Sequence, residues 1–555
     1  MQLIDWIILV STLLLIVVYG TIKTRGAKSS IDYIKAGNQA KWWTIGLSVM
    51  ATQASAITFL STPGQAFHDG MGFIQFYFGV PLAIIIVCIV FIPIYHKLKV
   101  YTAYEYLESR FDLKTRTLTA LLFLIQRSLS AGITIFAPAI ILSSVLGWDL
   151  TTLNIVLGLL VIIYTVSGGT KAVNYTQKYQ MGIIFIGLLI CLAVIINLLP
   201  ENINFKNAID IAGANSKLEV LNFSFDLENR YTIWSGLIGG TFLMMSYFGT
   251  DQSQVQRYLS GKSLKEMQLG MIFNGILKIP MQFFILFIGV MVFVFYQFNS
   301  SPINFNPQSI SIVNNTTYEK DYNTLQNELN NIFNEKQYQI NNYLSGNYDA
   351  KYGLSELELK EKKLRLEAKN LIALASKEKK IKVETNDKDY VFITFILENL
   401  PKGLIGLLLA VILSAAMSST SSEINALATT TAIDIYKRNK KNVTDDQLVK
   451  STKFFTFLWG IIAIGIACVA YLADNLIQLV NIIGSIFYGN VLGIFLIAFF
   501  FKFIKSNAIF YAAILTQIVI IYGWYNDWMP FLWLNVFGCI VVISIASLLQ
   551  LTQRN

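Results

Sequence analysis

The sequence predicts an all-α integral membrane protein with about thirteen transmembrane helices. Hydrophobic residues make up 54% of the 555 residues and charged residues only 14%, whereas soluble proteins carry about 25% charged residues. Apolar segments recur along the whole chain, and many approach the ~20 residues that cross a bilayer as a helix. A single soluble core does not explain this pattern, because such cores stop growing at roughly 250–300 residues.

The apolar segments define the predicted spans in chain order. They are residues 5–20, 43–66, 73–95, 117–145, 151–167, 180–199, 231–249, 268–297, 402–433, 454–472, 475–501, 507–524 and 529–551. The first segment lacks a basic leader and a small-residue cleavage site, so we expect it to be retained as a helix.

Basic residues predict the orientation of these spans. Alternate short loops hold most of the basic residues, among them Lys23, Arg25, Lys28, Lys97, Arg110, Arg257, Lys437 and Arg438. The opposite short loops hold Lys206, Lys217 and Arg230. Because basic loops remain in the cytoplasm, we expect an outside N-terminus and a cytoplasmic C-terminus, in the plasma (cell inner) membrane.

The segment 298–395 differs from the rest of the chain, because it is polar and rich in charge. Segments this long cross the membrane regardless of charge, so we expect an extracellular insertion built from a solvated helical pair. The predicted organisation is an N-terminal extra helix and cytoplasmic loop (1–42), a first five-helix repeat (43–199), an extracellular loop (200–230), the start of a second repeat (231–297), the insertion (298–395), the rest of the second repeat (396–501) and two C-terminal helices (502–555).

Two predicted spans contain polar and helix-breaking clusters. The first reads MATQASAITFLSTPGQ, with Pro63 and Gly64, and the second reads SGLIGGTFLMMSYFGTDQ, with Gly239, Gly240 and Gly249 among its glycines. Each opens a block of five spans, so the second block starts on the opposite side of the membrane and the repeat is inverted. Interrupted helices at matching positions of two halves mark a transporter's binding site. For either helix alone, close packing through small residues explains the pattern equally well.

Span 402–433 carries the densest polar run, SAAMSSTSSEINALATTT. On a helix, Ala415, Ser418, Ser419 and Ser422 share one broad face, with Glu423 one turn beyond Ser419. Hydroxyl and carbonyl oxygens suit a hard cation such as Na⁺. Serine hydroxyls also bond to their own helix, so the residue types alone leave both roles open.

At these motifs the chain resembles the sodium/solute symporter family, which includes sodium–glucose, iodide, monocarboxylate, pantothenate and sialic acid transporters. The resemblance runs from about residue 35 to 505 and is interrupted by the insertion. It rests on AGNQAKWWTIGLSVMATQASAITFLSTPG, YTAYEYLESRF, YTVSGGTKAV, DQSQVQRYL and SAAMSSTSSEINALATTTAIDIYKR. It implies a five-plus-five inverted repeat and sodium-driven alternating access.

The resemblance also implies site residues, position by position. The common sodium site maps to Ala51, Ala54, Ala415, Ser418 and Ser419, and the inner aromatic gate maps to Tyr247. The solute positions map to Thr58, Gln75, Tyr77, Met244, Lys278 and Asn481. The glutamine and glutamate that hold sugar hydroxyls are not kept, and Met244 replaces an asparagine, which argues against a hexose.

A further departure concerns the number of ions. Members that use a second sodium ion often have an aspartate where this chain has Gln177. We therefore expect this second ion site to be absent or altered. Glu423 is a candidate to supply a carboxylate there, and pairing of Glu423 with Lys178 is an equal alternative.

Arg127 is the sharpest indication of the solute class. It lies ten residues into span 117–145, about 15 Å deep at 1.5 Å per residue. A charge at that depth costs at least ~2.5–3.5 kcal/mol, so it needs a partner. Resemblance to the sialic acid transporters implies a bidentate contact with a solute carboxylate. A structural ion pair or carbonyl clamp is the alternative, and Lys278, equally deep in its span, could share either role.

The sequence thus predicts a sodium-coupled symporter that imports a small polar organic solute, such as a sugar, a sugar acid like sialic acid, or a monocarboxylate. The expected partners are Na⁺, the solute and the lipid bilayer, without nucleic acid and without a required oligomer. The alternatives are an ion channel, which would show repeated pore helices or rings of charge, and a solute sensor without coupled transport. We expect no enzyme, since the predicted spans lack clustered His, Cys or paired catalytic carboxylates.

Overall fold

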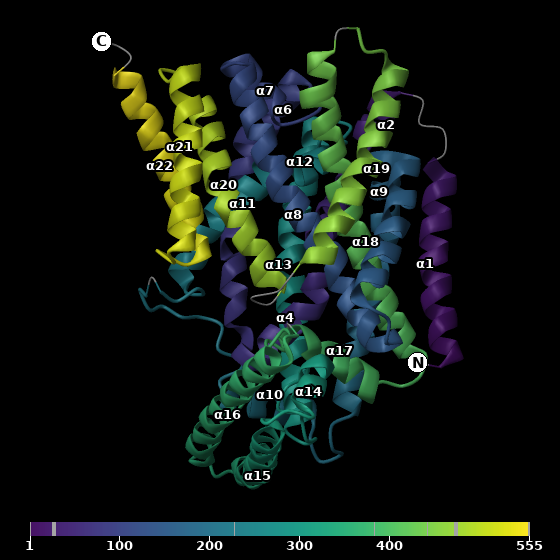
Figure 1. Ribbon diagram of the computed structural model, residues 1–555, viewed down its shortest axis with the longest axis vertical. Coiled ribbons are helices and arrows are strands. Elements are labelled where there is room, and N and C mark those ends of the chain that lie inside the picture. Colours follow the sequence, from purple (N-terminus) through teal and green to yellow (C-terminus); the bar gives the residue numbers. More distant parts are fainter. Residues whose placement is uncertain are drawn as a thin grey trace.

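The computed structural model describes residues 2–24, 29–226, 228–381, 383–440, 442–470 and 476–552, and they form a helical bundle. Within these residues there is no β-strand, only an isolated bridge between Ala40 and Gly261. Figure 1 shows long helices side by side, with a smaller helical lobe at one end. The N-terminus lies at the end that carries the lobe, and the C-terminus lies at the opposite end (Figure 1).

Long helices form most of the bundle. They are α1 (Leu3–Thr24), α8 (Leu113–Leu146), α9 (Leu150–Asn197), α13 (Leu264–Tyr296), α18 (Leu404–Thr430), α19 (Asp445–Val469), α20 (Leu476–Phe500), α21 (Ser506–Tyr525) and α22 (Phe531–Thr552). Predicted span 73–95 is covered by the 3₁₀ segment η2 (Gly70–Phe78), α5 (Gly79–Ile86), a π-helical turn and α6 (Ile92–Leu98). In the described residues, nine helical stretches are long and apolar enough to cross a membrane. Parts of the predictions lie outside the described residues, namely Arg25, Lys28, 471–472 and 475.

A sharp reversal at Gly169 divides α9 into two helices. Gly169 has φ +54°, and a Cβ there would lie 2.5 Å from the Tyr33 carbonyl oxygen. The hydroxyls of Tyr164 and Thr176 lie 2.5 Å apart, although twelve residues of uninterrupted helix would separate them by about 18 Å. The chain therefore turns back, and predicted spans 151–167 and 180–199 form its two arms.

The first interrupted helix breaks earlier than Pro63 and Gly64 suggest. α3 (Trp42–Gln53) ends at Ala54, and α4 (Ala56–Asp69) begins after Ser55. Pro63 lies inside α4, where its missing N–H only removes one helical hydrogen bond. Gly64 has a packing role, because a Cβ there would lie 1.7 Å from the Lys388 carbonyl oxygen of α17 (Lys388–Asn399).

The second interrupted helix contains two irregularities. A π-helical turn (Ser235–Gly239) leads into α11 (Gly240–Gly249), which ends before α12 (Gln252–Tyr258). Between α11 and α12, Asp251 caps the new helix by accepting a hydrogen bond from the Ser253 backbone N–H at 2.9 Å. Both interrupted helices contact α20, and α18 packs against α3 and α4.

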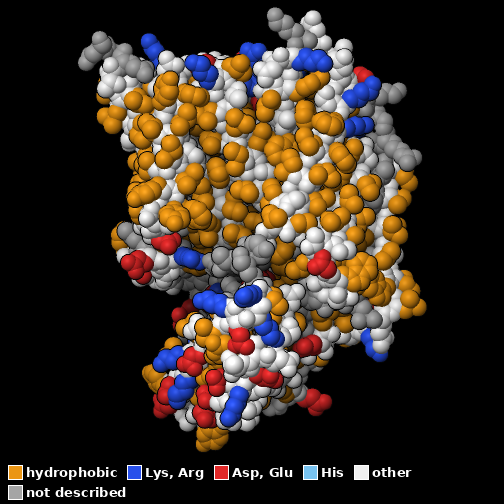
Figure 2. All heavy atoms as spheres, viewed as in Figure 1, with side chains coloured by type: hydrophobic (Ala, Val, Ile, Leu, Met, Phe, Trp, Pro, Cys, Tyr) orange, Lys and Arg blue, Asp and Glu red, His pale blue; other side chains and the backbone are white. Residues whose placement is uncertain are grey.

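The outer surface of the bundle is suited to lipid. Figure 2 shows a broad band of hydrophobic side chains across the visible face of the bundle, with Lys and Arg gathered at the edge opposite the lobe. The lobe instead shows Lys, Arg, Asp and Glu mixed over its surface (Figure 2). This distribution agrees with a membrane-embedded bundle and a solvated lobe.

The lobe is the predicted insertion, and it contains the expected helical pair. It comprises α14 (Pro307–Val313), α15 (Glu319–Leu344), α16 (Ala350–Lys379) and the connection to α17. Leu329 and Ile332 of α15 and Leu357, Leu364 and Ile372 of α16 belong to its small separate hydrophobic core. The hairpin therefore folds around apolar contacts of its own.

Buried ion pairs attach this hairpin to the bundle. Glu358 accepts hydrogen bonds from Lys217 and Lys336, each at 2.7 Å, and Lys336 also contacts Glu361 at 2.7 Å. Lys217 further donates to the His68 carbonyl oxygen, at the end of α4, at 2.9 Å. Burial opposes ionisation, but the neighbouring cations outweigh it, so the pKa of Glu358 lies well below its usual range and the pKa of Glu361 falls to about 2.

Breaking this cluster should loosen the hairpin. Glu358→Gln leaves two buried lysines short of a counter-charge, and we expect a local loss of about 3–5 kcal/mol. Hydrogen exchange in α15 and α16 would measure it. The matched control is Glu356→Gln, since the pair of Glu356 with Lys360 is exposed and should contribute little. Unchanged exchange in Glu358→Gln would contradict a structural role for the cluster.

The same cluster predicts an acid response of the hairpin. Because the folded-state pKa values of Glu358 and Glu361 are depressed, their stabilisation is complete above the unfolded value of about 4.3 and is lost as pH falls toward 2. Hairpin protection should therefore be constant from neutral pH to about 5 and decrease below about 4.3. Loss of protection that begins near pH 6 would point to other groups.

Candidate functional site

A small cavity lies where the two interrupted helices meet α8, α18 and α20. Its volume is about 90 Å³, which is enough for several water molecules. The lining includes Thr58, Tyr77, Arg127, Met244 and Asn481 from the predicted solute positions, the predicted gate Tyr247, and Ser419 and Glu423 from the predicted ion positions. The structure thus brings together residues from distant parts of the sequence.

Gln75 lies in a different chamber from the one predicted. Its amide nitrogen donates to the Tyr231 carbonyl oxygen at 3.1 Å, and its amide oxygen accepts from the Asn222 backbone N–H at 2.8 Å. It lines a separate outer chamber of about 910 Å³, next to the loop that precedes the second interrupted helix. The sequence could not separate Gln75 from Tyr77, since only the local backbone decides which chamber each side chain faces.

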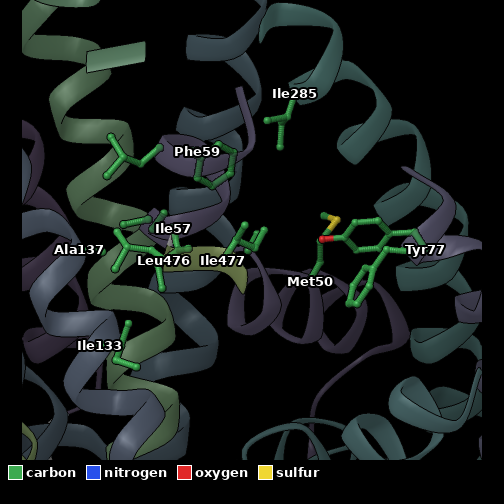
Figure 3. Packing of buried hydrophobic residues seen from close by; sticks show 14 of the residues in the cluster. Met50, Ile57, Phe59, Tyr77, Ile133, Ala137, Ile285, Leu476 and Ile477 are labelled. Atoms are coloured by element: carbon green, nitrogen blue, oxygen red, sulfur yellow. The ribbon is translucent and has the colours of Figure 1, made fainter. Parts of the chain in front are cut away.

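An aromatic layer separates the two chambers. The rings of Phe73 and Phe76 stack at 5.6 Å between centroids, Phe76 meets Tyr77 at 4.9 Å, and Phe73 meets Tyr231 at 5.1 Å. Figure 3 shows Tyr77 pointing its hydroxyl end toward Met50 of α3. These rings lie between the cavity and the outer chamber, since Phe76 and Tyr77 line the first and Phe73 and Tyr231 line the second.

Tyr247 of α11 forms another part of the cavity wall. Its ring lies 6.1 Å from the ring of Tyr488, and its hydroxyl accepts a hydrogen bond from the Gln254 side chain of α12 at 2.5 Å. A role for Tyr247 as the inner gate remains a prediction that fits this position.

Two of the predicted sodium ligands, Ala51 and Ser418, meet near the break between α3 and α4. The Ser418 hydroxyl donates to the Ala51 carbonyl oxygen at 3.2 Å, which joins α18 to the last turn of α3. Ala54 follows the last residue of α3, where carbonyl groups lack helical partners and the helix dipole is negative. Ser419 lies one turn from Ala415, whose carbonyl oxygen its hydroxyl contacts at 3.1 Å. This set of carbonyl and hydroxyl oxygens fits Na⁺.

Gln177, the residue expected to alter a second ion site, is hydrogen-bonded on both sides of its amide. Its nitrogen donates to the Thr52 hydroxyl at 3.1 Å, the Ser422 hydroxyl at 2.9 Å and the Ser418 carbonyl oxygen at 3.3 Å. Its amide oxygen accepts from Ser48. The Gln177 amide therefore bridges α3 and α18.

Arg127 is already neutralised by carboxylates in this structure. It is 3% exposed, donates to Glu423 at 2.9 Å and to the Tyr488 hydroxyl at 2.6 Å, and forms an ion pair with Asp251. Two roles were expected for Arg127, a contact with a solute carboxylate and a structural ion pair, and the structure contains the ion pair.

Glu423 and Asp251, the two carboxylates that contact Arg127, each differ from what the sequence suggested. Glu423 pairs with Arg127, whereas Lys178 lies over the rings of Trp43 and Tyr175 at 4.8 and 4.6 Å, so the suggested pair of Glu423 with Lys178 is not formed. Sequence reasoning missed Asp251, although a lone carboxylate directly after an interrupted helix was a usable signal.

The chain is similar to known membrane transporters. The chain matches the sodium:solute symporter family (SSF) over residues 33–334 and 364–516. It is 26% identical to the sodium/sialic acid symporter SiaT of Proteus mirabilis, over 97% of this chain and 93% of that protein. It is also 26% identical to sodium-coupled monocarboxylate transporter 1 of Xenopus laevis, over 90% of this chain and 69% of that protein.

A solved structure shares the fold. The structure of a Na⁺-coupled sialic acid symporter in a substrate-bound outward-open state superimposes with a TM-score of 0.75, covering 99% of this chain and 98% of that chain at 24% identity. The fold and the site define a membrane transporter. The chain belongs to the sodium:solute symporter family, and Na⁺ is its coupling ion.

The ion pairs of Arg127 lead to a stability prediction. Arg127→Met leaves Asp251 and Glu423 without a counter-charge in the protein interior, which should cost about 3–5 kcal/mol and lower the melting temperature of the purified protein. Adding Asp251→Asn and Glu423→Gln should recover part of the loss, because no buried charge then remains in this cluster. A triple variant less stable than Arg127→Met would contradict this account.

Proposed function

We propose that the protein is a sodium-driven symporter that imports a small polar organic solute by alternating access. The contact between the Ser418 hydroxyl and the Ala51 carbonyl oxygen, next to the cavity-lining residues Ser419 and Thr52, carries this proposal. The names of the relatives support it, since they are sodium-coupled transporters of monocarboxylates and sialic acid.

The proposed mechanism follows from the position of the ion site. Na⁺ at Ala51, Ala54, Ala415, Ser418 and Ser419 connects the broken helix to α18, so its binding orders both walls of the cavity. The solute then binds beside Thr58, Met244 and Asn481. The aromatic layer and Tyr247 open in turn, which exposes the loaded cavity to one side of the membrane at a time.

The orientation belongs to the same proposal. The lobe lies at the end of the bundle where the chain begins, and Lys and Arg gather at the other edge (Figures 1 and 2). An extracellular lobe and a cytoplasmic C-terminus in the cell membrane satisfy the positive-inside rule. The outer chamber of about 910 Å³ then faces the solute supply.

Sodium dependence is the direct test of this proposal. Uptake into proteoliposomes should require an inward sodium gradient, and potassium should not replace sodium. Ser418→Ala combined with Ser419→Ala should raise the sodium concentration for half-maximal uptake at least several-fold, because two ligand oxygens are removed. Ser414→Ala is the matched control, since it removes a buried hydroxyl from α18 one turn before Ser418. Uptake that proceeds equally well without sodium would exclude the mechanism.

The Gln177 amide predicts one sodium ion per solute. At zero membrane potential, a tenfold sodium gradient should hold an about tenfold solute gradient for one ion and an about hundredfold gradient for two. Equilibrium accumulation in proteoliposomes, with the potential clamped by potassium and valinomycin, gives this ratio. A hundredfold value would show that the altered site still binds sodium, and Glu423→Gln should then lower it.

A further inference from the structure

An apolar groove opens on the side of the bundle, between α1 and the second arm of α9. Figure 1 shows α1 at the edge of the bundle beside α9, and α1 packs against both α9 and α18. The groove has a volume of about 360 Å³, which lies within the roughly 300–1,000 Å³ of ligand pockets. Its apolar lining comprises Leu15 and Ile16 of α1, Tyr179 and Ile183 of α9, and Leu407 of α18.

The groove faces the hydrocarbon of the bilayer. Leu15 is 70% exposed and Tyr179 is 50% exposed, whereas Ile16 on the inner wall is buried. Leu15 lies twelve residues after Leu3, the first residue of α1, which places it about 18 Å along this helix. Because the hydrocarbon core is about 30 Å thick, the groove lies inside it. An apolar groove at this depth is filled by an apolar chain and not by a water-soluble molecule.

A basic and aromatic cluster lies beside the groove. The Lys178 ammonium lies 4.8 Å from the centroid of the Trp43 ring and 4.6 Å from that of Tyr175, and Lys178 directly precedes the groove residue Tyr179. Trp43 belongs to the first turn of α3 and is 39% exposed. Since Trp and Tyr side chains gather at the boundary between membrane and water, this cluster lies at the level of the lipid headgroups.

The cluster carries positive charge that the protein does not neutralise. Lys171 and Lys178 lie seven residues apart, so they share one face of the second arm of α9. Among the described residues, no carboxylate pairs with either lysine, and Lys178 contacts only aromatic rings. Lysines at the membrane surface attract anionic lipids. A negatively charged headgroup therefore fits this position.

Gly182 connects the lysine to the groove. It lies one turn after Lys178 and directly before Ile183, and a Cβ at this position would have no atom within 4 Å. The surface between the headgroup level and the groove is therefore open. Lys178 and Ile183 are five residues apart, or about 7.5 Å along the helix. A single lipid can thus contact the ammonium with its phosphate and enter the groove with one chain.

We propose that this groove binds an acyl chain of an anionic phospholipid whose phosphate lies against Lys178. The lipid is a structural ligand and not the transported solute, so the inference is independent of the proposed function. It holds α1 against α9 and α18. Thr176 lines the groove and Lys178 binds the headgroup, and they flank Gln177, which bridges α3 and α18. The bound lipid therefore supports the wall of the helices that carry the ion site.

The charge test uses native mass spectrometry of the full-length protein in detergent. The probes are palmitoyl-oleoyl phosphatidylglycerol and the phosphatidylcholine with the same chains. We expect phosphatidylglycerol to bind more tightly, and Lys178→Gln to weaken its binding about fivefold, the factor for one lysine beside an anionic surface. Phosphatidylcholine binding should not change. Lys265→Gln is the matched control, since it removes an exposed lysine from the first turn of α13.

The groove test fills the space for the acyl chain. Leu15→Trp should weaken the binding of both lipids, because the larger ring occupies the groove. Ile276→Trp is the matched control, since Ile276 of α13 is 65% exposed and lies outside the groove. The same spectra report the oligomeric state. A dimer of the unmodified protein that Leu15→Trp abolishes, without a change in lipid binding, would assign the groove to a second copy and overturn the inference.

A measurement on the unmodified protein covers the case in which the variants do not fold. The melting temperature should rise with palmitoyl-oleoyl phosphatidylglycerol, because a ligand of the folded state stabilises it. Dihexanoyl phosphatidylglycerol has the same headgroup but short chains, so it should stabilise less, and inorganic phosphate should have no effect. Equal stabilisation by phosphate, equal binding of phosphatidylglycerol and phosphatidylcholine, or unchanged lipid binding in Lys178→Gln and Leu15→Trp would each overturn the inference.

Discussion

The break between α3 and α4 is the constraint on which the site depends. Inside a membrane, backbone polar groups must find partners within the protein, so an interrupted helix persists only where other atoms satisfy the freed groups. Here Ser418 of α18 donates to the Ala51 carbonyl oxygen, and Gln177 bridges the same two helices through Thr52 and Ser422. The polar run of α18 therefore supplies partners for the groups freed at the break.

Buried charged side chains are the second feature that organises the bundle. Arg127, Asp251 and Glu423 neutralise most of one another beside the cavity, and Tyr488 completes their hydrogen bonds. Paired charges of this kind fix the relative positions of α8, α11, α18 and α20 more than they add stability. Lys278 follows the opposite pattern, because the described residues give it no counter-charge. Within the described residues, Arg127 and Lys278 thus differ in whether a carboxylate pairs with them.

The lobe shows how a polar insertion can be held on a membrane protein. Its hairpin has its own apolar core, but Lys217 and Glu358 join it to the end of α4, and Gly64 allows α17 to approach α4 closely. α4 is the second half of the interrupted helix and its Thr58 lines the cavity, so the lobe contacts an element of the candidate site. The family match omits residues 335–363, which places much of the hairpin outside the shared part of the chain.

The apolar segments by themselves determined the helical class and the positions of the predicted spans, because hydrocarbon accepts only long apolar helices. The polar runs likewise located the break and the α18 face, although the chain breaks at Ala54–Ser55 and not at Pro63. The tertiary structure decided which side chains pair with one another. In the sequence, Arg127 and Lys278 cannot be distinguished, since each is a single cation deep in an apolar helix. Gln75 and Tyr77 cannot be distinguished either. Their partners come from residues more than a hundred positions away, and only the packed bundle shows which cation is neutralised and which chamber each side chain faces.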